Sequence, residues 1–131
     1  MNNISRKSLI DNCETGDILL YNSINPVGRL IEYFTGSKFS HVAIILRDPI
    51  HINPKLKGLY IVESGSENIK DTLSDKKIIG VQVIPLDYVL DQYQNGYIGN
   101  LYYRKLECIR DAKFSEKITN IVINTDTKPY D

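Results

Sequence analysis

The chain of 131 residues is 42% hydrophobic and 24% charged, which is the composition of an ordinary globular protein and excludes a disordered or fibrous one. Its length is that of one domain with its own core, so we expect residues 1–131 to form a single domain. Sixteen basic and sixteen acidic side chains cancel, and no basic run exceeds two residues, so charge alone recruits neither nucleic acid nor an anionic membrane.

The first two predicted elements are a buried strand and an amphipathic helix. The segment GDILLYNS, residues 16–23, is an apolar, partly β-branched run between turn-forming residues, which is typical of a buried strand. In the segment that follows, Asn25 can cap a helix, Pro26 suits its first turn and Gly36 can end it. The helical spacing of the apolar residues predicts that one face packs against the core: Val27, Leu30, Ile31 and Phe34.

The rest of the chain predicts a mainly antiparallel sheet. Strands are expected at Ser40–Arg47 and Leu59–Ser64, joined by a polar, proline-containing loop that is too short for a crossover helix. A fourth strand is expected at residues 81–86, a short helix at 86–96, a fifth strand at 100–106 and a helix over 110–125. Because consecutive strands are expected to be neighbours, the fold class is α+β, with about five mainly antiparallel strands flanked by helices.

Neither a targeting signal nor a metal-binding pattern is evident. The longest apolar run, residues 42–46, is far shorter than a membrane span, and the first residues lack the apolar centre of a signal peptide. We therefore expect no transmembrane segment and a cytosolic type of protein. Cys13 and Cys108 are far apart and have no CxxC partner, which predicts reduced thiols, no metal and no cofactor.

One histidine stands at the start of a predicted strand, and an acid stands near the end of the next. If the two strands pair as a hairpin with Leu46 facing Gly58, His41 faces Glu63. Both side chains then lie on the same face of the sheet, at one end of an otherwise apolar surface. Directly opposed Cβ atoms are about 4.5 to 5.5 Å apart, which lets the carboxylate reach the imidazole. A register error of two residues would weaken this to a diagonal contact.

Such a pair has two interpretations. A carboxylate that accepts a hydrogen bond from one imidazole nitrogen fixes the tautomer and leaves the other nitrogen free as a base. The pair His41 and Glu63 is then the base half of a site for nucleophilic catalysis. The alternative is a histidine at the edge of a sheet that is satisfied by a nearby acid and has no catalytic role.

The order of the segments resembles that of a known family. The strand GDILLYNS, a helix leading into YFTGSKFSHVAIIL, the strand LYIVESGS, and NLYYRKL followed by a helix and TKPYD are together similar to the circularly permuted branch of the papain-like NlpC superfamily. That branch includes bacterial and poxvirus proteins of the YiiX type and is related to lecithin retinol acyltransferase. The resemblance covers residues 13–131 and implies a permuted papain-like fold, with the histidine at the strand start as base and a polar residue on the next strand as its orienter. The matching positions are His41 and Glu63.

The same resemblance places the nucleophile outside this chain. In the family a cysteine follows the motif similar to KPYD, at the start of a helix, whereas this sequence ends at Asp131. We therefore expect the domain to be truncated at its C-terminus, with the nucleophilic cysteine and its helix beyond residue 131. Cys13 is a poor substitute because it lies too close to the first strand to begin a helix, although it could approach His41 if the first two strands are neighbours. Cys108 is expected in a turn after the fifth strand.

These observations lead to two hypotheses of function. The first is a cysteine peptidase-like or amidase-like thiol hydrolase, or an acyltransferase, which acts on an amide or ester bond of a small-molecule, peptide or lipid substrate. The second is a catalytically inactive binding or structural module of the same fold, such as a component of a virion or another assembly. In either case we expect a protein of the cytoplasm or of a virion. A cleaved or partial chain whose remainder completes the site is the third possibility.

Overall fold

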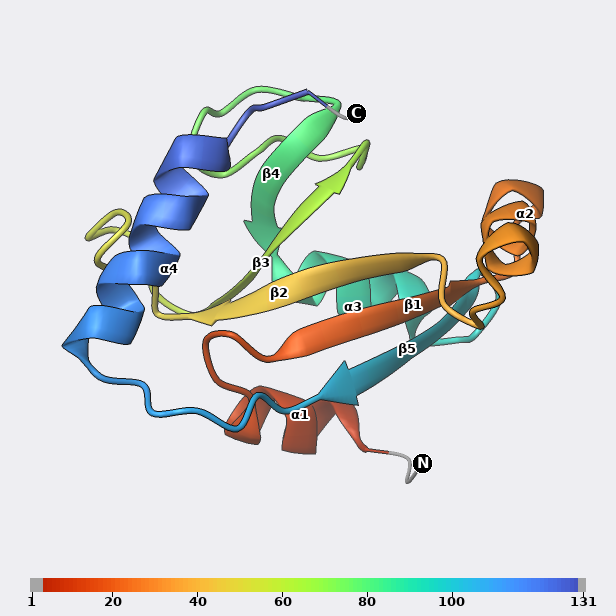
Figure 1. The fold of residues 1–131 in the computed structure, drawn as a ribbon, viewed down its shortest axis with the longest axis horizontal. Helices are drawn as coiled ribbons and strands as arrows, with labels where there is room; N and C mark the ends of the chain where they lie inside the picture. The colour runs from red at the N-terminus through yellow and green to blue at the C-terminus, as the bar shows by residue number, and fades with distance from the viewer. Residues whose placement is uncertain (1–3, 130–131) are drawn as a thin grey trace.

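A five-stranded antiparallel sheet with helices on both faces organises the chain (Figure 1). The computed structural model describes residues 4–129, and within them the predicted α+β class is confirmed. The elements in chain order are α1 (Arg6–Asn12), β1 (Ile18–Ser23), α2 (Pro26–Thr35), β2 (His41–Arg47), β3 (Leu59–Gly65), β4 (Gly80–Pro85), α3 (Leu86–Tyr93), β5 (Gly99–Arg104) and α4 (Ala112–Thr125).

Helix ends follow the predicted signals where the sequence carries them. The side chain of Asn25 accepts a hydrogen bond from the backbone of Gly28 at 2.7 Å, and Gly36 ends α2 with φ of 65°. Asp111 caps α4 in the same way as Asn25 caps α2. Helix α1 was not predicted, because its seven residues bury only Leu9 and carry no apolar period that the sequence could reveal.

The strand order, β4-β3-β2-β1-β5, differs from the expected chain order at one point. Strand β5 pairs with β1 rather than with β4. The free edge of β4 is instead occupied by residues 127–129, since the backbone of Val81 exchanges hydrogen bonds with Thr127 and Lys128. Helix α3 connects the two edges of the sheet. The expectation that consecutive strands are neighbours was therefore right for β1 to β4 and wrong for β5.

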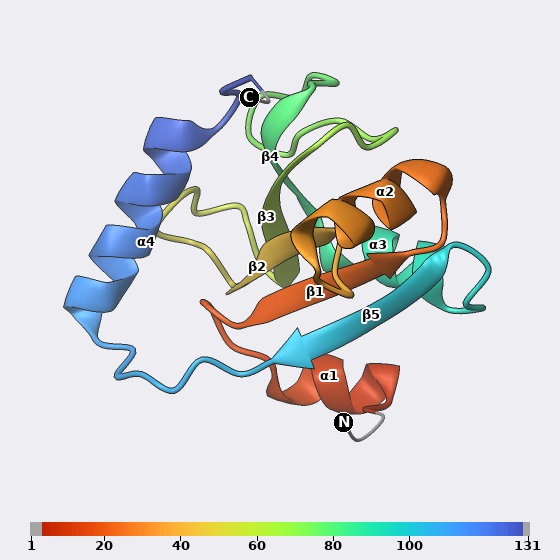
Figure 2. The same cartoon turned by 45° about the vertical axis from the view of Figure 1, so that its right-hand side comes forward.

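Each face of the sheet has its own apolar core. One face packs against α1 and α3 through alternate strand residues: Leu19, Tyr21, Ala43, Ile45, Ile61 and Ile84. The opposite face packs against α4, where Val122 is buried with Leu46 and Val83 and the side chain of Ile118 is half-buried. In Figure 2, α4 lies beside β2 and β3, whereas α1 lies below β5. His41 and Glu63 follow the strand alternation of the first face, so both lie at the edge of the larger core.

The apolar stripe of α2 does not face the core, and this prediction was wrong. The helix lies beyond the end of β1 (Figure 1), away from the part of the sheet that α1 and α3 cover. Its opposite face contacts β1: the side chain of Asn22 donates to Glu32, and Gly28 lies so close to Ser23 that a Cβ at this position would meet the serine Cβ at 2.7 Å. The stripe is left largely exposed, at Val27 (68%), Leu30 (56%), Ile31 (37%) and Phe34 (77%).

The register between β2 and β3 differs from the predicted one by two residues. Leu46 pairs with Tyr60, and Arg47 pairs with Leu59. The reason lies in the loop between the strands, which is closed by two hydrogen bonds between Asp48 and Gly58. The backbone N–H of Asp48 donates to the Gly58 carbonyl, and the Asp48 carboxylate accepts from the Gly58 backbone N–H, both at 2.7 Å. The loop therefore closes at Asp48 and Gly58 rather than at Leu46 and Gly58.

The carboxyl group of Asp126, directly after α4, lies close to the carboxyl group of Asp71. Burial and the neighbouring Asp71 carboxylate raise the pKa of Asp126 to about 7. Asp71 is fully buried and accepts hydrogen bonds from the backbones of Ser74 and Val83. A proton held by Asp126 therefore reduces the repulsion between the two groups and keeps residues 127–129 against β4.

Stability is expected to fall as the pH rises from about 4 to about 7. An aspartate in the unfolded chain has a pKa of about 4, whereas Asp126 in the folded chain keeps its proton up to about pH 7. The folded state thus binds more protons in this interval, so raising the pH favours unfolding. We expect Asp126→Asn to flatten this dependence and to stabilise the protein at pH 8 by about 1 kcal/mol, a value reduced for solvent screening. Urea unfolding at pH 5 and pH 8 measures both effects.

The matched control is Glu107→Gln, which changes an exposed acid in a loop. In this variant the free energy of unfolding should differ between pH 5 and pH 8 by the same amount as in the unsubstituted protein. An equal pH dependence in the protein and in Asp126→Asn would show that Asp126 does not hold the proton.

Candidate functional site

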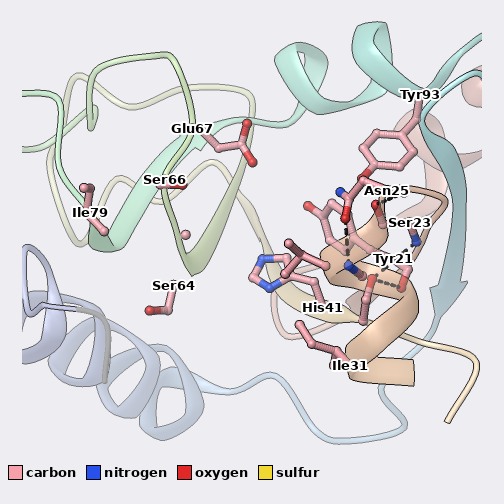
Figure 3. Close-up of a pocket in the computed structure, with 14 residues that line it drawn as sticks. Tyr21, Ser23, Asn25, Ile31, His41, Ser64, Ser66, Glu67, Ile79 and Tyr93 are labelled. Carbon is pink, nitrogen blue, oxygen red and sulfur yellow. Dashed lines mark hydrogen bonds between the residues drawn. The ribbon is translucent and has the colours of Figure 1, made fainter. Parts of the chain in front are cut away.

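A cleft opens where strands β2 and β3 separate. Their backbone pairing runs from Arg47 and Leu59 to Ile44 and Val62, whereas residues 41–43 pair with β1. Figure 1 shows β3 and β4 turning away from β2 at this end. The cleft has a volume of about 570 Å³ and lies between α2, the start of β2, the residues around the end of β3 and Tyr93 of α3 (Figure 3).

The two residues singled out from the sequence meet at this cleft. The Nε2 atom of His41 lies 2.6 Å from Oε2 of Glu63. The contact is diagonal, because the observed register continues with Glu63 beside Ala43. Diagonal neighbours remain within reach of long side chains, and the separation of β2 from β3 leaves space for both. The predicted contact is confirmed, although the predicted direct opposition of the two residues was wrong.

The environment of the pair makes the carboxylate the fixed partner. The side chain of Glu63 is fully buried, while that of His41 is 29% exposed. The second oxygen of Glu63, Oε1, accepts a long hydrogen bond of 3.4 Å from the buried Gln82. A buried carboxylate needs such partners to compensate for its lost hydration. Glu63 therefore holds the imidazole by Nε2, on the side away from solvent.

The other imidazole nitrogen is the one available for chemistry. With Nε2 bonded to Glu63, Nδ1 has no hydrogen-bond partner among residues 4–129. The ring of Tyr21 lies edge-on to that of His41, with ring centroids 4.9 Å apart and planes at 65°, which limits rotation of the imidazole. An oriented imidazole with one free nitrogen at a cleft can accept a proton from a nucleophile and return it to a leaving group.

Acidic and aromatic side chains form the wall of the cleft that faces His41 (Figure 3). Burial raises the pKa of Glu67, and the charge of Glu63 raises it further, whereas His41 lowers it. Burial also raises the pKa values of Tyr21 and Tyr93, and the charges of Glu63 and Glu67 add to both shifts. Both phenols therefore remain protonated at neutral pH, beside a half-buried carboxyl group.

Neither cysteine of the chain lies at this cleft. Cys13 is fully buried, and its sulfur is 3.8 Å from Nη2 of Arg47. Arg47 and His41 occupy opposite ends of β2, roughly 20 Å apart at the rise of a β-strand. Burial raises the pKa of Cys13, and the nearby Arg47 only partly offsets this. Cys108 is exposed in the turn after β5. Although β1 and β2 are neighbours, Cys13 is thus not brought to His41.

Sequence reasoning missed two residues that shape the site. Tyr21 pairs directly with His41 in the β1–β2 register, and the alternation of GDILLYNS places it on the face of Leu19, which was a readable signal. Glu67 follows β3 in a loop, and no period or motif indicated its approach to the cleft. Away from the cleft, the sequence also carried no sign that Asp17, in the segment GDILLYNS, is fully buried and hydrogen-bonded to Leu106 and Arg110.

No family model matches this chain, and no curated protein matches it at a significant level. Within residues 4–129, no group of three or more His, Cys, Asp or Glu side chains is arranged to hold a metal ion. Across the same residues, no helix combines the length and the apolar character that crossing a membrane requires.

Proposed function

We propose that this chain carries the base and the orienting acid of a thiol hydrolase or acyltransferase that acts on an amide or ester bond. His41 is the base, Glu63 is its orienter, and the nucleophilic cysteine is supplied by residues that follow position 131, as in the permuted papain-like family that the sequence resembles. The observation that carries the proposal is the contact of 2.6 Å between His41 Nε2 and Glu63 Oε2 at the cleft.

The path of the chain supports this arrangement. Lys128 and Pro129 line a second hollow, of about 560 Å³, together with His41 and Glu63. Pro129 is held beside Gly80 at the start of β4. Residues that continue from this point in a longer protein would therefore begin close to the imidazole. A helix N-terminus in this position would favour the thiolate form of a cysteine.

The proposed reaction uses the free nitrogen of His41. Nδ1 accepts the proton of the thiol, and the sulfur forms a bond to the carbonyl carbon of the substrate. The imidazolium returns this proton to the amine or alcohol that leaves, and an acyl-enzyme thioester remains. In a hydrolase, water then attacks the thioester while His41 takes its proton, which releases the acid and the thiol. In an acyltransferase, an acceptor hydroxyl or amine takes the place of water.

Thiol reactivity tests the proposal. The protein is isolated from its natural source, its intact mass is measured, and it is alkylated with iodoacetamide between pH 5 and pH 9. We expect a third thiol whose alkylation rate reaches half its maximum below pH 7, whereas an ordinary cysteine has a pKa of about 8.5. The buried Cys13 serves as the internal control, because it should react only after unfolding.

Two outcomes of this experiment would contradict the proposal. One is an intact mass that leaves no residues after position 131. The other is a longer chain whose additional cysteines react as ordinary thiols. Either result would leave the second hypothesis, a binding or structural module of this fold without turnover.

A further inference from the structure

The cleft beside His41 has an acidic corner that no lysine or arginine of residues 4–129 neutralises, although His41 partly offsets the effect of burial on the pKa of Glu67. Glu67 is half-buried, and burial together with the charge of Glu63 raises its pKa. No lysine or arginine is among the residues of the described chain that line the cleft. Glu63 is already bonded to His41. Glu67 is therefore the carboxylate of this cleft that is free to bind a ligand.

A buried hydroxyl group in the same corner lacks a partner. Tyr21 is 4% exposed and lines the cleft; its hydroxyl lies near Glu63, which adds to the effect of burial in raising its pKa, yet its oxygen forms no hydrogen bond of normal geometry with residues 4–129. Leaving such a group unpaired costs about 1 to 3 kcal/mol, which a ligand can recover. Figure 3 shows the rings of Tyr21 and Tyr93 side by side at the cleft, across from Glu67; their centroids are 5.5 Å apart.

Tyr21, Glu67 and Tyr93 all line the same cleft. The charge of Glu67 contributes to the raised pKa of both Tyr21 and Tyr93, although burial is the larger cause for each. A ligand that enters here meets one carboxylate, one or two phenol oxygens and the edges or faces of aromatic rings.

We propose that this corner binds a protonated primary amine of the substrate, through hydrogen bonds from the ammonium group to the Glu67 carboxylate and the Tyr21 hydroxyl oxygen. The assignment of the ligand as substrate rests on the proposed function, and it names the substrate class: an amide or ester with a free amino group near the bond that is attacked. An anion is excluded by repulsion from Glu63 and Glu67. A neutral ligand would leave the Glu67 charge uncompensated in a half-buried position.

The position of the corner limits where the amino group lies in the substrate. The rings of Tyr21 and His41 are in edge contact, with centroids 4.9 Å apart. An ammonium group bound at the Tyr21 hydroxyl and a carbonyl group beside His41 are thus separated by a few bonds. Aminoacyl amides and esters with a free amino terminus have this spacing.

Binding of small amines tests the inference without requiring catalysis. Glycinamide, which is cationic at neutral pH, is titrated into ¹⁵N-labelled protein and compared with the neutral N-acetylglycinamide and with tetramethylammonium, a cation without N–H donors. We expect glycinamide to shift the backbone signals of residues 21, 41, 65–67 and 93, and the other two compounds to bind at least about tenfold more weakly, the loss expected for a charge-assisted hydrogen bond.

Variants separate the two contacts. Glu67→Gln should weaken glycinamide binding about tenfold, and Tyr21→Phe about fivefold, because it removes one oxygen and keeps the ring. Glu116→Gln, an exposed acid on α4, is the matched control and should bind glycinamide as the unsubstituted protein does. The amide spectrum of each variant reports whether the fold is retained.

Equal binding of glycinamide and N-acetylglycinamide would overturn the inference, as would a Glu67→Gln variant with unchanged affinity. Its failure is distinguishable from that of the proposed function. Amine binding does not involve a thiol, so the titration can fail while a cysteine of depressed pKa is present, and it can succeed while no such cysteine exists.

Discussion

Replacing His41 by alanine is expected to lower the rate of ester hydrolysis at least about a thousandfold in the protein that carries the nucleophile, which is the order of loss when a member of a catalytic triad is removed. The imidazole is the group at the cleft that can move a proton between the thiol and the leaving group, and Glu63 holds it in place at 2.6 Å. The full-length protein, including the nucleophile, is expressed both unsubstituted and as His41→Ala. The rates at which the two proteins hydrolyse p-nitrophenyl acetate are then compared.

A second histidine provides the matched control. His51 lies exposed in the loop between β2 and β3, so His51→Ala should leave the rate unchanged. Glu63→Gln should cost less than His41→Ala, because an amide oxygen can still accept a hydrogen bond from Nε2. A His41→Ala variant that retains its fold and at least half of the activity would show that the imidazole is not the base.

Replacing Asp17 by alanine is expected to lower the free energy of unfolding by about 3 to 5 kcal/mol, the order of loss when one member of a buried, hydrogen-bonded charge pair is removed. Asp17 is fully buried and lies between the start of β1 and the segment after β5. It accepts hydrogen bonds from the backbones of Glu14 and Leu106, from the hydroxyl of Tyr103, and from Nη2 of Arg110 at 2.7 Å. Alanine would leave all four donors without this acceptor.

The pH dependence of the Asp17 contribution has a definite sign. Burial by itself raises the pKa of Asp17, but the hydrogen bonds from Tyr103, Leu106 and Glu14 and the charge of Arg110 outweigh it, so the pKa is lowered. The stabilisation is therefore present above the pKa of an unfolded aspartate, about 4, and is lost as the pH falls below it. The difference in stability between the protein and Asp17→Ala should shrink accordingly at pH 3.

Urea unfolding at pH 7 measures the loss as a shift of the midpoint at unchanged slope. Asp87→Ala is the matched control: its carboxylate also pairs with an arginine, Arg6, at 3.0 Å, but its side chain is 73% exposed. Exposed ion pairs contribute about 0 to 1 kcal/mol, so this variant should be close to the unsubstituted protein. An Asp17→Ala variant of equal stability would show that the buried hydrogen bonds of Asp17 are replaced by others.

The sequence predicted the fold where local patterns act on their own. Strands, caps and helix ends follow turn-forming residues and polar caps, so β1 to β4, α2 and α4 were found close to their observed limits. The position of β5 could not be read in this way, because pairing between distant strands depends on which sheet edge is free. The orientation of α2 was misjudged for the same kind of reason: an apolar period shows that a helix has an apolar face, but not what the rest of the chain leaves for that face to contact.

The candidate site was predictable in part. Strand alternation was sufficient to place His41 and Glu63 on one face, because a register error of two residues leaves the face unchanged. The closure of the loop by Asp48 and Gly58, which sets the true register, depends on a side-chain hydrogen bond that no period reveals. Glu67 lies in an irregular loop, so its approach to Tyr21 follows only from the three-dimensional path of the chain.

The separation of β2 from β3 gives the His41–Glu63 contact a mechanical role. Backbone pairing between the two strands ends at Ile44 and Val62. Beyond this point, the hydrogen bond between the His41 imidazole and the Glu63 carboxylate connects the two strands. A substitution that removes this bond, such as His41→Ala, would loosen the sheet at the entrance that the two side chains border. The width of that entrance and the alignment of the base are consequently controlled by one and the same pair of atoms.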